Sequence, residues 1–322
     1  MDLLLQRTKS GKYIIKYDAS LYKKSNCKRY VWFKLLRGLV QGEGQRDFKI
    51  EYGTAFHKAL ALWYSDIHAS IEQCTQVAFD HYGQPDIFIP DDDYRSLSHL
   101  VNCFMQYVDY YKKEGETLSP LIRNGKPVLE VSFAYPYYST PLVDVLLCGT
   151  IDFRGLFGNS IPVIVDHKTT SSYYAQQFLD SYCISPQLMM YKMIWEMLFP
   201  AEDVQCMVNG IFLRKSNKNE FRRSLPIEFP PSVMKHFKNK LHKTIVYIVE
   251  GFSRYLASRI QGKLGQDIVD DFFIPNYTEC DGKFGLCEYL PLCLADGSDD
   301  GIEGIVENHY QLKTYDPSQF QK

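Results

Sequence analysis

The expected fold follows from residues 161–169, which read IPVIVDHKT. Isoleucine and valine dominate the start of this stretch, and they predict a buried strand that ends at Asp166 and Lys168. A second apolar segment upstream ends at Asp152, and the pair Gly158-Asn159 predicts a tight turn between the two segments. We therefore expect two neighbouring strands that bring two carboxylates and a lysine together.

This arrangement predicts the chemistry of a metal-dependent phosphodiesterase. Carboxylate oxygens hold hard divalent cations. Such a cation generates hydroxide from water and neutralises charge on the phosphate that is cut. A lysine can polarise the attacking water or stabilise the developing negative charge. Because short patterns of this kind occur by chance in many chains, the interpretation depends on which other residues accompany it.

Composition limits the class of protein. The chain has 322 residues, of which 45% are hydrophobic and 15% aromatic, and this excludes a disordered chain and allows a large core. No apolar run approaches the roughly 18–20 residues of a membrane span, and the first residues lack the layout of a signal peptide. We expect a soluble, intracellular, cytoplasmic protein without a membrane partner.

The formal net charge of −2 gives no indication of a nucleic-acid partner, but binding depends on local charge rather than on the total. Basic residues cluster in three segments, within 23–37, 215–223 and 235–243. Each cluster is either a solvated helix face or a set of phosphate contacts. The second interpretation gains weight beside a metal-hydrolase centre.

Periodicity divides the chain into helical and strand-forming parts. Helices are expected at 19–39, 53–68, 97–112, 185–199 and 231–260. Strands are expected at 127–135, 142–157, 161–169, 204–214 and 221–229. This order predicts an α/β fold. Its expected parts are an N-terminal helical part (1–126), a core of sheet and helices (127–262) and a C-terminal tail (263–322).

Further residues are candidates for the same site. His57 can complete a metal shell, although a lone histidine on a helix is more often structural. Glu130 is a carboxylate within an apolar strand, and is either a ligand or the solvent side of the alternation. Gln187 and Tyr191 lie one helical turn apart and share a face, where they can bind phosphate or orient Lys168.

Four of the nine cysteines form a distinct set. Cys280, Cys287 and Cys293 lie close together in the tail, whereas Cys27 lies near the other end of the chain. Disulfides are not expected in an intracellular protein, but four thiolates suit Zn²⁺ or a [4Fe–4S] cluster. Spacing does not separate zinc from iron, and unrelated free cysteines are a third alternative.

Short motifs recur along the chain in an order that is specific when they are taken together. They are Ser20-Leu21-Tyr22 with Cys27-Lys28-Arg29-Tyr30, Gly53 with His57, Gly149 with Asp152, Asp166-His167-Lys168-Thr169, and Gln187 with Tyr191. This order resembles the RecB-type branch of the PD-(D/E)XK nucleases, a group that includes AddB and the iron–sulfur nucleases of CRISPR systems. The resemblance covers about residues 18–293.

The resemblance implies a restriction-endonuclease-like fold. Such a fold has a mixed central sheet flanked by helices, here with an N-terminal helical elaboration and a C-terminal cysteine staple. The resemblance also implies that Mg²⁺ or Mn²⁺ is bound by His57, Asp152, Asp166 and the backbone carbonyl of His167. At position 167 the family more often has tyrosine or an aliphatic residue, and because the carbonyl is the ligand we expect activity to be retained.

Other roles are implied in the same way. Lys168 matches the catalytic lysine of the family, and Gln187 and Tyr191 match the helix motif that supports the site. Relatives with one N-terminal and three C-terminal cysteines join the two chain ends through a structural [4Fe–4S] cluster. The resemblance therefore assigns such a cluster, with Zn²⁺ as the alternative, to Cys27, Cys280, Cys287 and Cys293.

The resulting hypothesis is a Mg²⁺- or Mn²⁺-dependent deoxyribonuclease. Family analogy implies exonuclease action on ends of single- or double-stranded DNA, 5′-phosphate products, and a helicase or recombination protein as a partner. One alternative is a non-catalytic nucleic-acid-binding or scaffolding subunit, which is expected to lack an acid or the lysine. Another is an electron-transfer protein built around the cysteines, which leaves Asp152, Asp166 and Lys168 unexplained.

Overall fold

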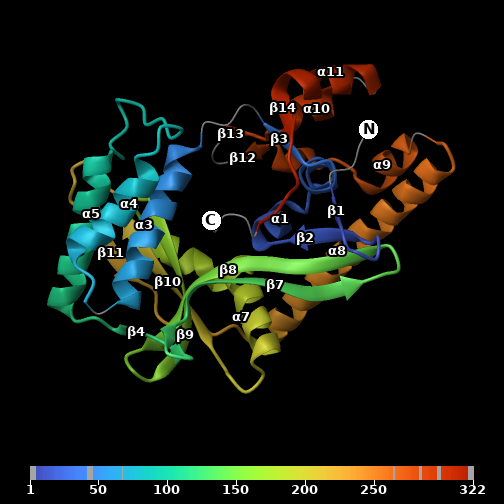
Figure 1. Ribbon diagram of the computed structural model, residues 1–322. Helices are drawn as coiled ribbons and strands as arrows, with labels where there is room; N and C mark the ends of the chain where they lie inside the picture. Colours follow the sequence, from blue (N-terminus) through green and yellow to red (C-terminus); the bar gives the residue numbers. More distant parts are fainter. Residues whose placement is uncertain are drawn as a thin grey trace. The chain divides into compact units, whose positions relative to one another are not determined.

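The computed structural model consists of two compact units, each assembled from segments that are distant in the sequence (Figure 1). The first unit comprises Met1–Gly44, Phe133–Gly149 and Pro231–Lys322, and the second comprises Gln45–Ser132 and Thr150–Pro230. The structure describes residues 5–41, 46–66, 68–263, 265–282, 285–295 and 299–317. The long strands β7 (Leu129–Ser139) and β8 (Val143–Phe157) contribute residues to both units.

The sheet of the second unit is mixed. After the last part of β8 come β9 (Ile161–Thr170), β10 (Gln205–Phe212) and β11 (Glu220–Arg223). The pair β8–β9 is antiparallel, β9–β10 is parallel and β10–β11 is antiparallel, while β4 (Leu118–Pro120) pairs with the end of β8. Gly158 and Asn159 both have positive φ, which confirms the tight turn predicted between β8 and β9.

Three helices cover one face of this sheet, and Figure 1 shows them side by side. They are α3 (Phe48–Ser65), α4 (Ile71–Tyr82) and α5 (Leu97–Glu114). At each start a side chain accepts a hydrogen bond from a backbone amide of the first turn, which stabilises the helix end. The helices and strands share one hydrophobic core, which includes Phe56, Phe104 and Val165.

Two other helices, α6 (Ala175–Asp180) and α7 (Pro186–Leu198), contact the other face of the sheet. Side chains alternate along a strand. Met207 of β10 belongs to the core under α3, whereas the neighbouring Cys206 contacts the backbone of Leu188 on α7. Ser185 caps α7 and proline occupies its first turn, which positions the start of α7 beside the sheet.

The first unit contains its own strands and the longest helix, α8 (Pro231–Ile260). Strand β2 (Tyr13–Tyr17) is parallel to the first part of β8 and antiparallel to β1 (Gln6–Arg7). The other elements used below are α1 (Ala19–Lys24), α2 (Lys28–Val31), η1 (Trp32–Leu36), α9 (Gln266–Phe272), η3 (Tyr277–Glu279) and α10 (Leu290–Leu294). Short pairs β3 (Leu39–Gln41) with β14 (Tyr310–Leu312) and β12 (Asp281–Gly282) with β13 (Gly285–Leu286), and α11 (Asp299–His309), complete it.

The predicted α/β fold, a mixed central sheet flanked by helices, is confirmed. One predicted helix, at 19–39, is wrong in detail because Cys27 adopts an extended conformation and divides it into α1, α2 and the π-helical turn η1. The helix predicted at 53–68 is α3, which ends at Ser65, and Ile67 lies outside the described residues. The predicted division into three parts stays a prediction. In the described parts of the chain, no helix has both the length and the apolar character required to cross a membrane.

Candidate active site

The candidate site lies within the second unit, where β8 and β9 separate. The last residues paired between these strands are Phe153 and Val165. Beyond them, the backbone amide of His167 donates a 2.8 Å hydrogen bond to a side chain of β8, at Oδ2 of Asp152. Asp152 is 9% exposed and Asp166 only 1% exposed. The end of the strand pairing therefore positions both acids below the surface.

Asp166 and Lys168 form an ion pair next to α7. The Nζ atom of Lys168 lies 2.8 Å from Oδ1 and 2.7 Å from Oδ2 of Asp166. From α7, Gln187 donates to Oδ1 of Asp166 at 3.3 Å and to the hydroxyl of Tyr191 at 3.0 Å. The structure thus brings together the acid, the lysine and the helix pair that were predicted to share a site.

His57 reaches the site from α3. Its Nδ1 lies 3.6 Å from Oδ2 of Asp152. A close approach of α3 to β9 allows this, because a Cβ atom at Gly53 would lie only 3.0 Å from the hydroxyl oxygen of Thr169. The packing of the helix on the strand therefore explains why the residue one turn before His57 is a glycine.

Glu130 completes a group of three close donors. One donor atom each from His57, Glu130 and Asp152 lies within 4.8 Å of the other two. Glu130 has a positive φ of 47°, which costs a residue with a side chain about 1 kcal/mol or more and is a feature often retained at functional sites. The sequence did not decide whether Glu130 is a ligand or a solvent-facing residue. The structure places its carboxylate beside His57 and Asp152.

Burial and crowding shift the pKa values of these groups. Burial raises the pKa of Asp152 and of Asp166. Burial and the charge of Asp152 raise the pKa of Glu130. Burial, and then the charge of Lys168, lower the pKa of His57 to about 4, so its ring is neutral at pH 7. Burial opposes the charge of Lys168, but Asp166 and Asp152 outweigh it and raise the pKa of the ammonium group.

The donor set fits a hard divalent cation such as Mg²⁺ or Mn²⁺. Carboxylate oxygens are the preferred ligands of such ions, and a neutral imidazole can supply a nitrogen. Asp152 and Asp166 are both buried, and acids packed together repel one another. A bound cation would relieve this repulsion.

A buried polar network contacts His167 from the core side of the sheet. Nδ2 of Asn209 donates to Nδ1 of His167 at 2.9 Å and to the hydroxyl of Tyr107 at 2.8 Å. Arg223 donates to the same hydroxyl at 3.2 Å and forms a 2.6 Å ion pair with Glu116. No motif marks these residues in the sequence. Asn209 becomes recognisable only through the register of β9 and β10, which places it next to His167.

The four predicted cysteines lie together in the first unit. Burial, and then the charges of Cys27, Cys280 and Cys287, raise the pKa of the Cys293 thiol to about 12. The Sγ atom of Cys27 accepts a hydrogen bond from the backbone amide of Asn276 at 3.4 Å. All four are free thiols in the described structure. Segments from both ends of the chain therefore supply one cluster of sulfur atoms.

The family of the chain follows from a comparison with protein-family models. No curated protein matches the chain. Among solved structures, an alkaline exonuclease (LHK-Exo) from Laribacter hongkongensis is similar over 66% of this chain and 98% of that chain, with 11% sequence identity and a TM-score of 0.29. A family model described as the PD-(D/E)XK nuclease superfamily matches residues 21–294, a span that includes every residue of the site. The chain therefore belongs to the PD-(D/E)XK nuclease superfamily.

Proposed function

We propose that this protein is a metal-dependent deoxyribonuclease that hydrolyses phosphodiester bonds. The observation that carries the proposal is the group of three donors from His57, Glu130 and Asp152, which lie within 4.8 Å of one another in the same site as the Asp166–Lys168 ion pair. Family membership supports a nuclease. Buried acids with raised pKa values are a further sign of a functional site.

In this proposal the site holds Mg²⁺ or Mn²⁺ through His57, Asp152, Asp166 and the carbonyl of His167, with Glu130 as an additional ligand. When bound, such an ion supplies hydroxide from water and neutralises charge on the phosphate. The neutral ring of His57 offers a nitrogen lone pair at pH 7 because its pKa is low. The carboxylates contribute the negative charge that a divalent ion requires.

Lys168 acts on the water or on the phosphate. Asp166 keeps the ammonium group of Lys168 protonated. This group can therefore donate a hydrogen bond to the attacking water or to a phosphate oxygen that gains charge. Gln187 holds Oδ1 of Asp166, and its amide is in turn hydrogen-bonded to Tyr191. Partners of this kind keep a ligand in the orientation that binding and catalysis require.

We further propose DNA as the substrate and exonuclease action at its ends, with 5′-phosphate products. The order of the motifs and the four cysteines support membership of the RecB-type branch, in which a helicase or recombination protein would be the partner. Sequence-specific cutting is less well supported because no separate sequence-reading module is evident in the sequence.

The test is Mn²⁺-dependent degradation of end-labelled linear DNA by anaerobically purified wild type and Asp166→Ala. Loss of degradation in this variant alone supports the assignment, and the labelled end reports polarity. Asp180→Ala is the matched control, because Asp180 is an exposed acid on α6 that is hydrogen-bonded to Gln176. Equal degradation by wild type and Asp166→Ala would locate the activity elsewhere. No degradation of single- or double-stranded DNA by either would favour a non-catalytic binding subunit.

We also propose that the sulfur cluster holds a structural [4Fe–4S] centre, with Zn²⁺ as the alternative. The four cysteines supply as many thiolates as either centre requires. By joining distant segments, such a centre would contribute to folding free energy.

Cys287→Ser tests this second proposal. The variant should lose bound metal and visible absorbance, and its melting temperature should fall, because one of the cross-linking ligands is gone. Cys183→Ser is the control, because Cys183 is an exposed cysteine of the second unit. Unchanged metal content and melting temperature in Cys287→Ser would contradict the proposal.

A further inference from the structure

One side of α8 forms a cavity together with the start of α2. His236, Lys240, Lys243 and Tyr247 are separated by three or four residues and therefore lie on one face of the helix. With Lys28 they line a cavity of about 530 Å³ within the first unit. Two segments far apart in the sequence thus contribute three lysines to the same hollow.

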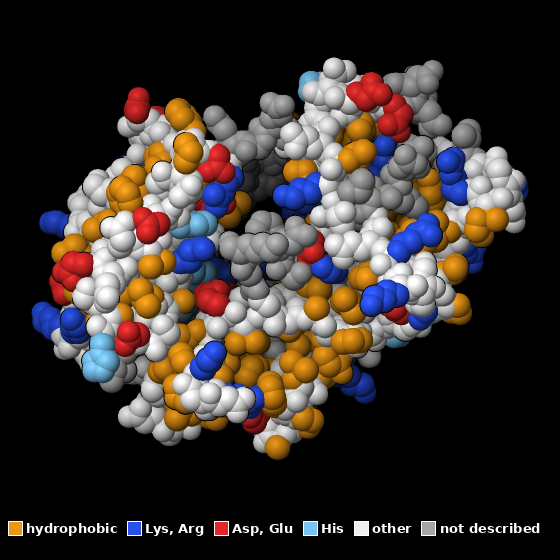
Figure 2. Space-filling view, viewed as in Figure 1, with side chains coloured by type: hydrophobic (Ala, Val, Ile, Leu, Met, Phe, Trp, Pro, Cys, Tyr) orange, Lys and Arg blue, Asp and Glu red, His pale blue; other side chains and the backbone are white. Residues whose placement is uncertain are grey.

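The lysines of this cavity carry uncompensated charge. Within the described residues, no carboxylate oxygen lies within 4.0 Å of Nζ of Lys28, Lys240 or Lys243. By contrast, Arg254 on the same helix is paired with Glu250 at 2.6 Å. Basic and acidic side chains are interspersed over the molecular face seen in Figure 2. A cavity lined by three unpaired lysines departs from that pattern and has the charge to attract an anion.

Aromatic rings and the backbone hold two of these ammonium groups in place. Nζ of Lys28 lies 5.8 Å from the ring centroid of Tyr247, and Nζ of Lys240 lies 6.0 Å from that of Tyr22. Such contacts attract a cation to the ring face. Lys28 also donates a hydrogen bond to the carbonyl of Ser25. The cavity is therefore more ordered than a set of freely moving surface lysines.

We propose that this α8 cavity binds the phosphodiester backbone of a nucleic acid. The inference rests on the proposed nuclease function, which supplies the nucleic acid, but it concerns a site made of other residues. Lysine ammonium groups meet phosphate oxygens as point charges, and His236 and Asn239 line the cavity with further donors. The ring of Tyr247 adds a surface on which a sugar or base can pack.

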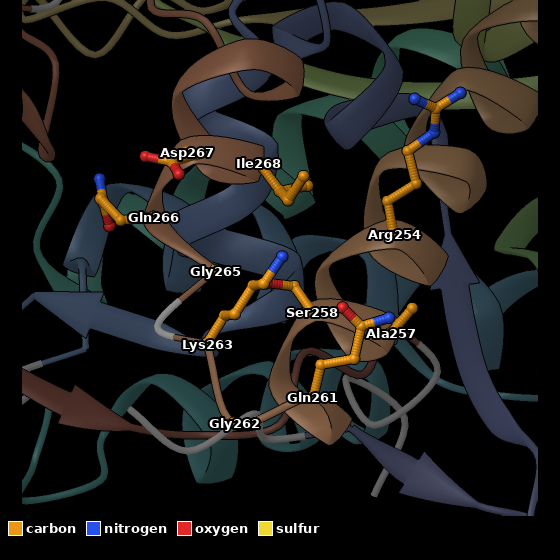
Figure 3. Close-up of a pocket in the computed structure, with 10 residues that line it drawn as sticks. All are labelled: Arg254, Ala257, Ser258, Gln261, Gly262, Lys263, Gly265, Gln266, Asp267 and Ile268. Atoms are coloured by element: carbon orange, nitrogen blue, oxygen red, sulfur yellow. The ribbon is translucent and has the colours of Figure 1, made fainter.

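A second cavity, of about 690 Å³, lies nearer the C-terminal end of α8 (Figure 3). Arg254 and Ser258 of α8 line it, together with Gln261 and Lys263 from the following loop. At 1.5 Å per residue, Lys240 and Arg254 are about 20 Å apart along the helix, a length that matches about six steps of a DNA strand. Glu250 and Asp267 offset part of the charge here, so the first cavity supplies the main attraction.

The test measures binding of a fluorescent oligonucleotide by anisotropy in EDTA, where cleavage cannot occur. We expect Lys240→Ala/Lys243→Ala to bind at least about 10-fold more weakly, and its plot of log affinity against log salt to lose about two units of slope. Both lysines are exposed, so the variant should keep the melting temperature of the wild type. Lys240→Arg/Lys243→Arg should retain binding, and Lys238→Ala, on a different face of α8, is the matched control.

Each outcome decides the inference separately from the nuclease function. Wild-type affinity and salt slope in the double alanine variant would overturn it, even where the wild type degrades DNA with Mn²⁺. Weaker binding of the double variant supports it, whether or not DNA is cleaved. Binding to vesicles of anionic phospholipid, and separately to inorganic phosphate, tests whether another phosphate compound is the ligand. A variant that loses binding to either of these but keeps its affinity for DNA would overturn the proposal.

Discussion

The backbone amide of His167 donates a 2.8 Å hydrogen bond to Oδ2 of Asp152, and this bond joins the two strands that carry the acids of the site. The same oxygen lies 3.6 Å from Nδ1 of His57. Asp152 therefore has two roles. One of its oxygens accepts a hydrogen bond that joins the strands, and its negative charge would help to bind the proposed metal. An amide oxygen accepts the same hydrogen bond without the charge, so the two roles can be separated by substitution.

Asp152→Asn should lose nuclease activity by at least about 100-fold, while the metal-free protein becomes about 0.5–2 kcal/mol more stable. Burial raises the pKa of Asp152, so its charge destabilises the folded state at neutral pH. The gain should be small near the unfolded-state pKa of about 4, should grow as the pH rises toward the folded-state pKa and should stay constant above it. Denaturant unfolding in EDTA measures it. A less stable Asp152→Asn protein would contradict the charge argument.

Lys168→Met should reduce the rate of DNA hydrolysis by about 100- to 1000-fold, because the variant loses the donor that meets developing charge. Methionine retains an unbranched, apolar side chain in place of the lysine stem. Affinity for Mn²⁺ should change little, because Lys168 is not a proposed ligand. Single-turnover rates at saturating Mn²⁺, together with a Mn²⁺ titration, separate the two quantities. A rate close to that of the wild type would remove Lys168 from the mechanism.

Gln187→Ala should weaken Mn²⁺ affinity or activity by about 10- to 100-fold. It removes the 3.3 Å hydrogen bond to Oδ1 of Asp166 and lets this carboxylate turn. Tyr191→Phe is the matched comparison, since it removes only the hydroxyl that accepts from Gln187 at 3.0 Å. Its effect should be smaller. Activity measured across a Mn²⁺ series tests both variants, and a larger loss in Tyr191→Phe would assign the main role to the phenol.

Glu130→Gly and Glu130→Gln separate backbone strain from ligand chemistry. Glycine adopts a φ of 47° without strain, so Glu130→Gly should stabilise the metal-free protein by up to about 1 kcal/mol. Glutamine retains the strain. Both should weaken Mn²⁺ binding, because both remove a carboxylate that lies beside His57 and Asp152. Calorimetric titration with Mn²⁺ provides the test, and wild-type affinity in both variants would exclude Glu130 as a ligand.

Acid should destabilise the second unit through His99. Its Nδ1 lies 2.9 Å from the hydroxyl of Tyr52 and its Nε2 lies 3.3 Å from the carbonyl oxygen of Arg214, contacts that a neutral ring satisfies. Burial lowers the pKa of His99. The contribution of neutral His99 to the free energy of unfolding is therefore complete above the unfolded-state pKa of about 6.5. It is lost as the pH falls toward the folded-state pKa.

His99→Gln removes this titration and keeps an acceptor for Tyr52. From about pH 7.5 to 5.5 the free energy of unfolding should fall in both proteins. The fall should be smaller in the variant than in the wild type, by up to about 1 kcal/mol. Urea denaturation at the two pH values gives the comparison. Parallel losses in both proteins would mean that His99 does not contribute to acid sensitivity.

Local patterns were sufficient for the elements that carry the acids. The strands β8 and β9, the turn at Gly158 and Asn159, and the helix α7 were all predicted, because composition and periodicity reflect interactions between near neighbours. Helix α4 was not predicted. Its buried side chains include the small or polar residues Cys74, Thr75 and Ala78, which give a weak apolar signal.

Local patterns failed where a distant segment decides the conformation. Cys27 lies in a segment with helical periodicity, yet it is extended and accepts a hydrogen bond from Asn276 at the other end of the chain. Glu130 lies in a segment with strand composition, yet its backbone has positive φ. In both cases the tertiary contacts of the residue outweigh its local preference.

The sequence alone was enough to propose Asp152, Asp166 and Lys168 as one group, because they stand at the ends of adjacent strands. Only the tertiary structure decided that Glu130 joins His57 and Asp152, and that Asn209 contacts His167. Those contacts depend on how α3 packs on β9 and on the register between β9 and β10. Both are set by the burial of side chains from many segments at once, and spacing along the chain does not record them.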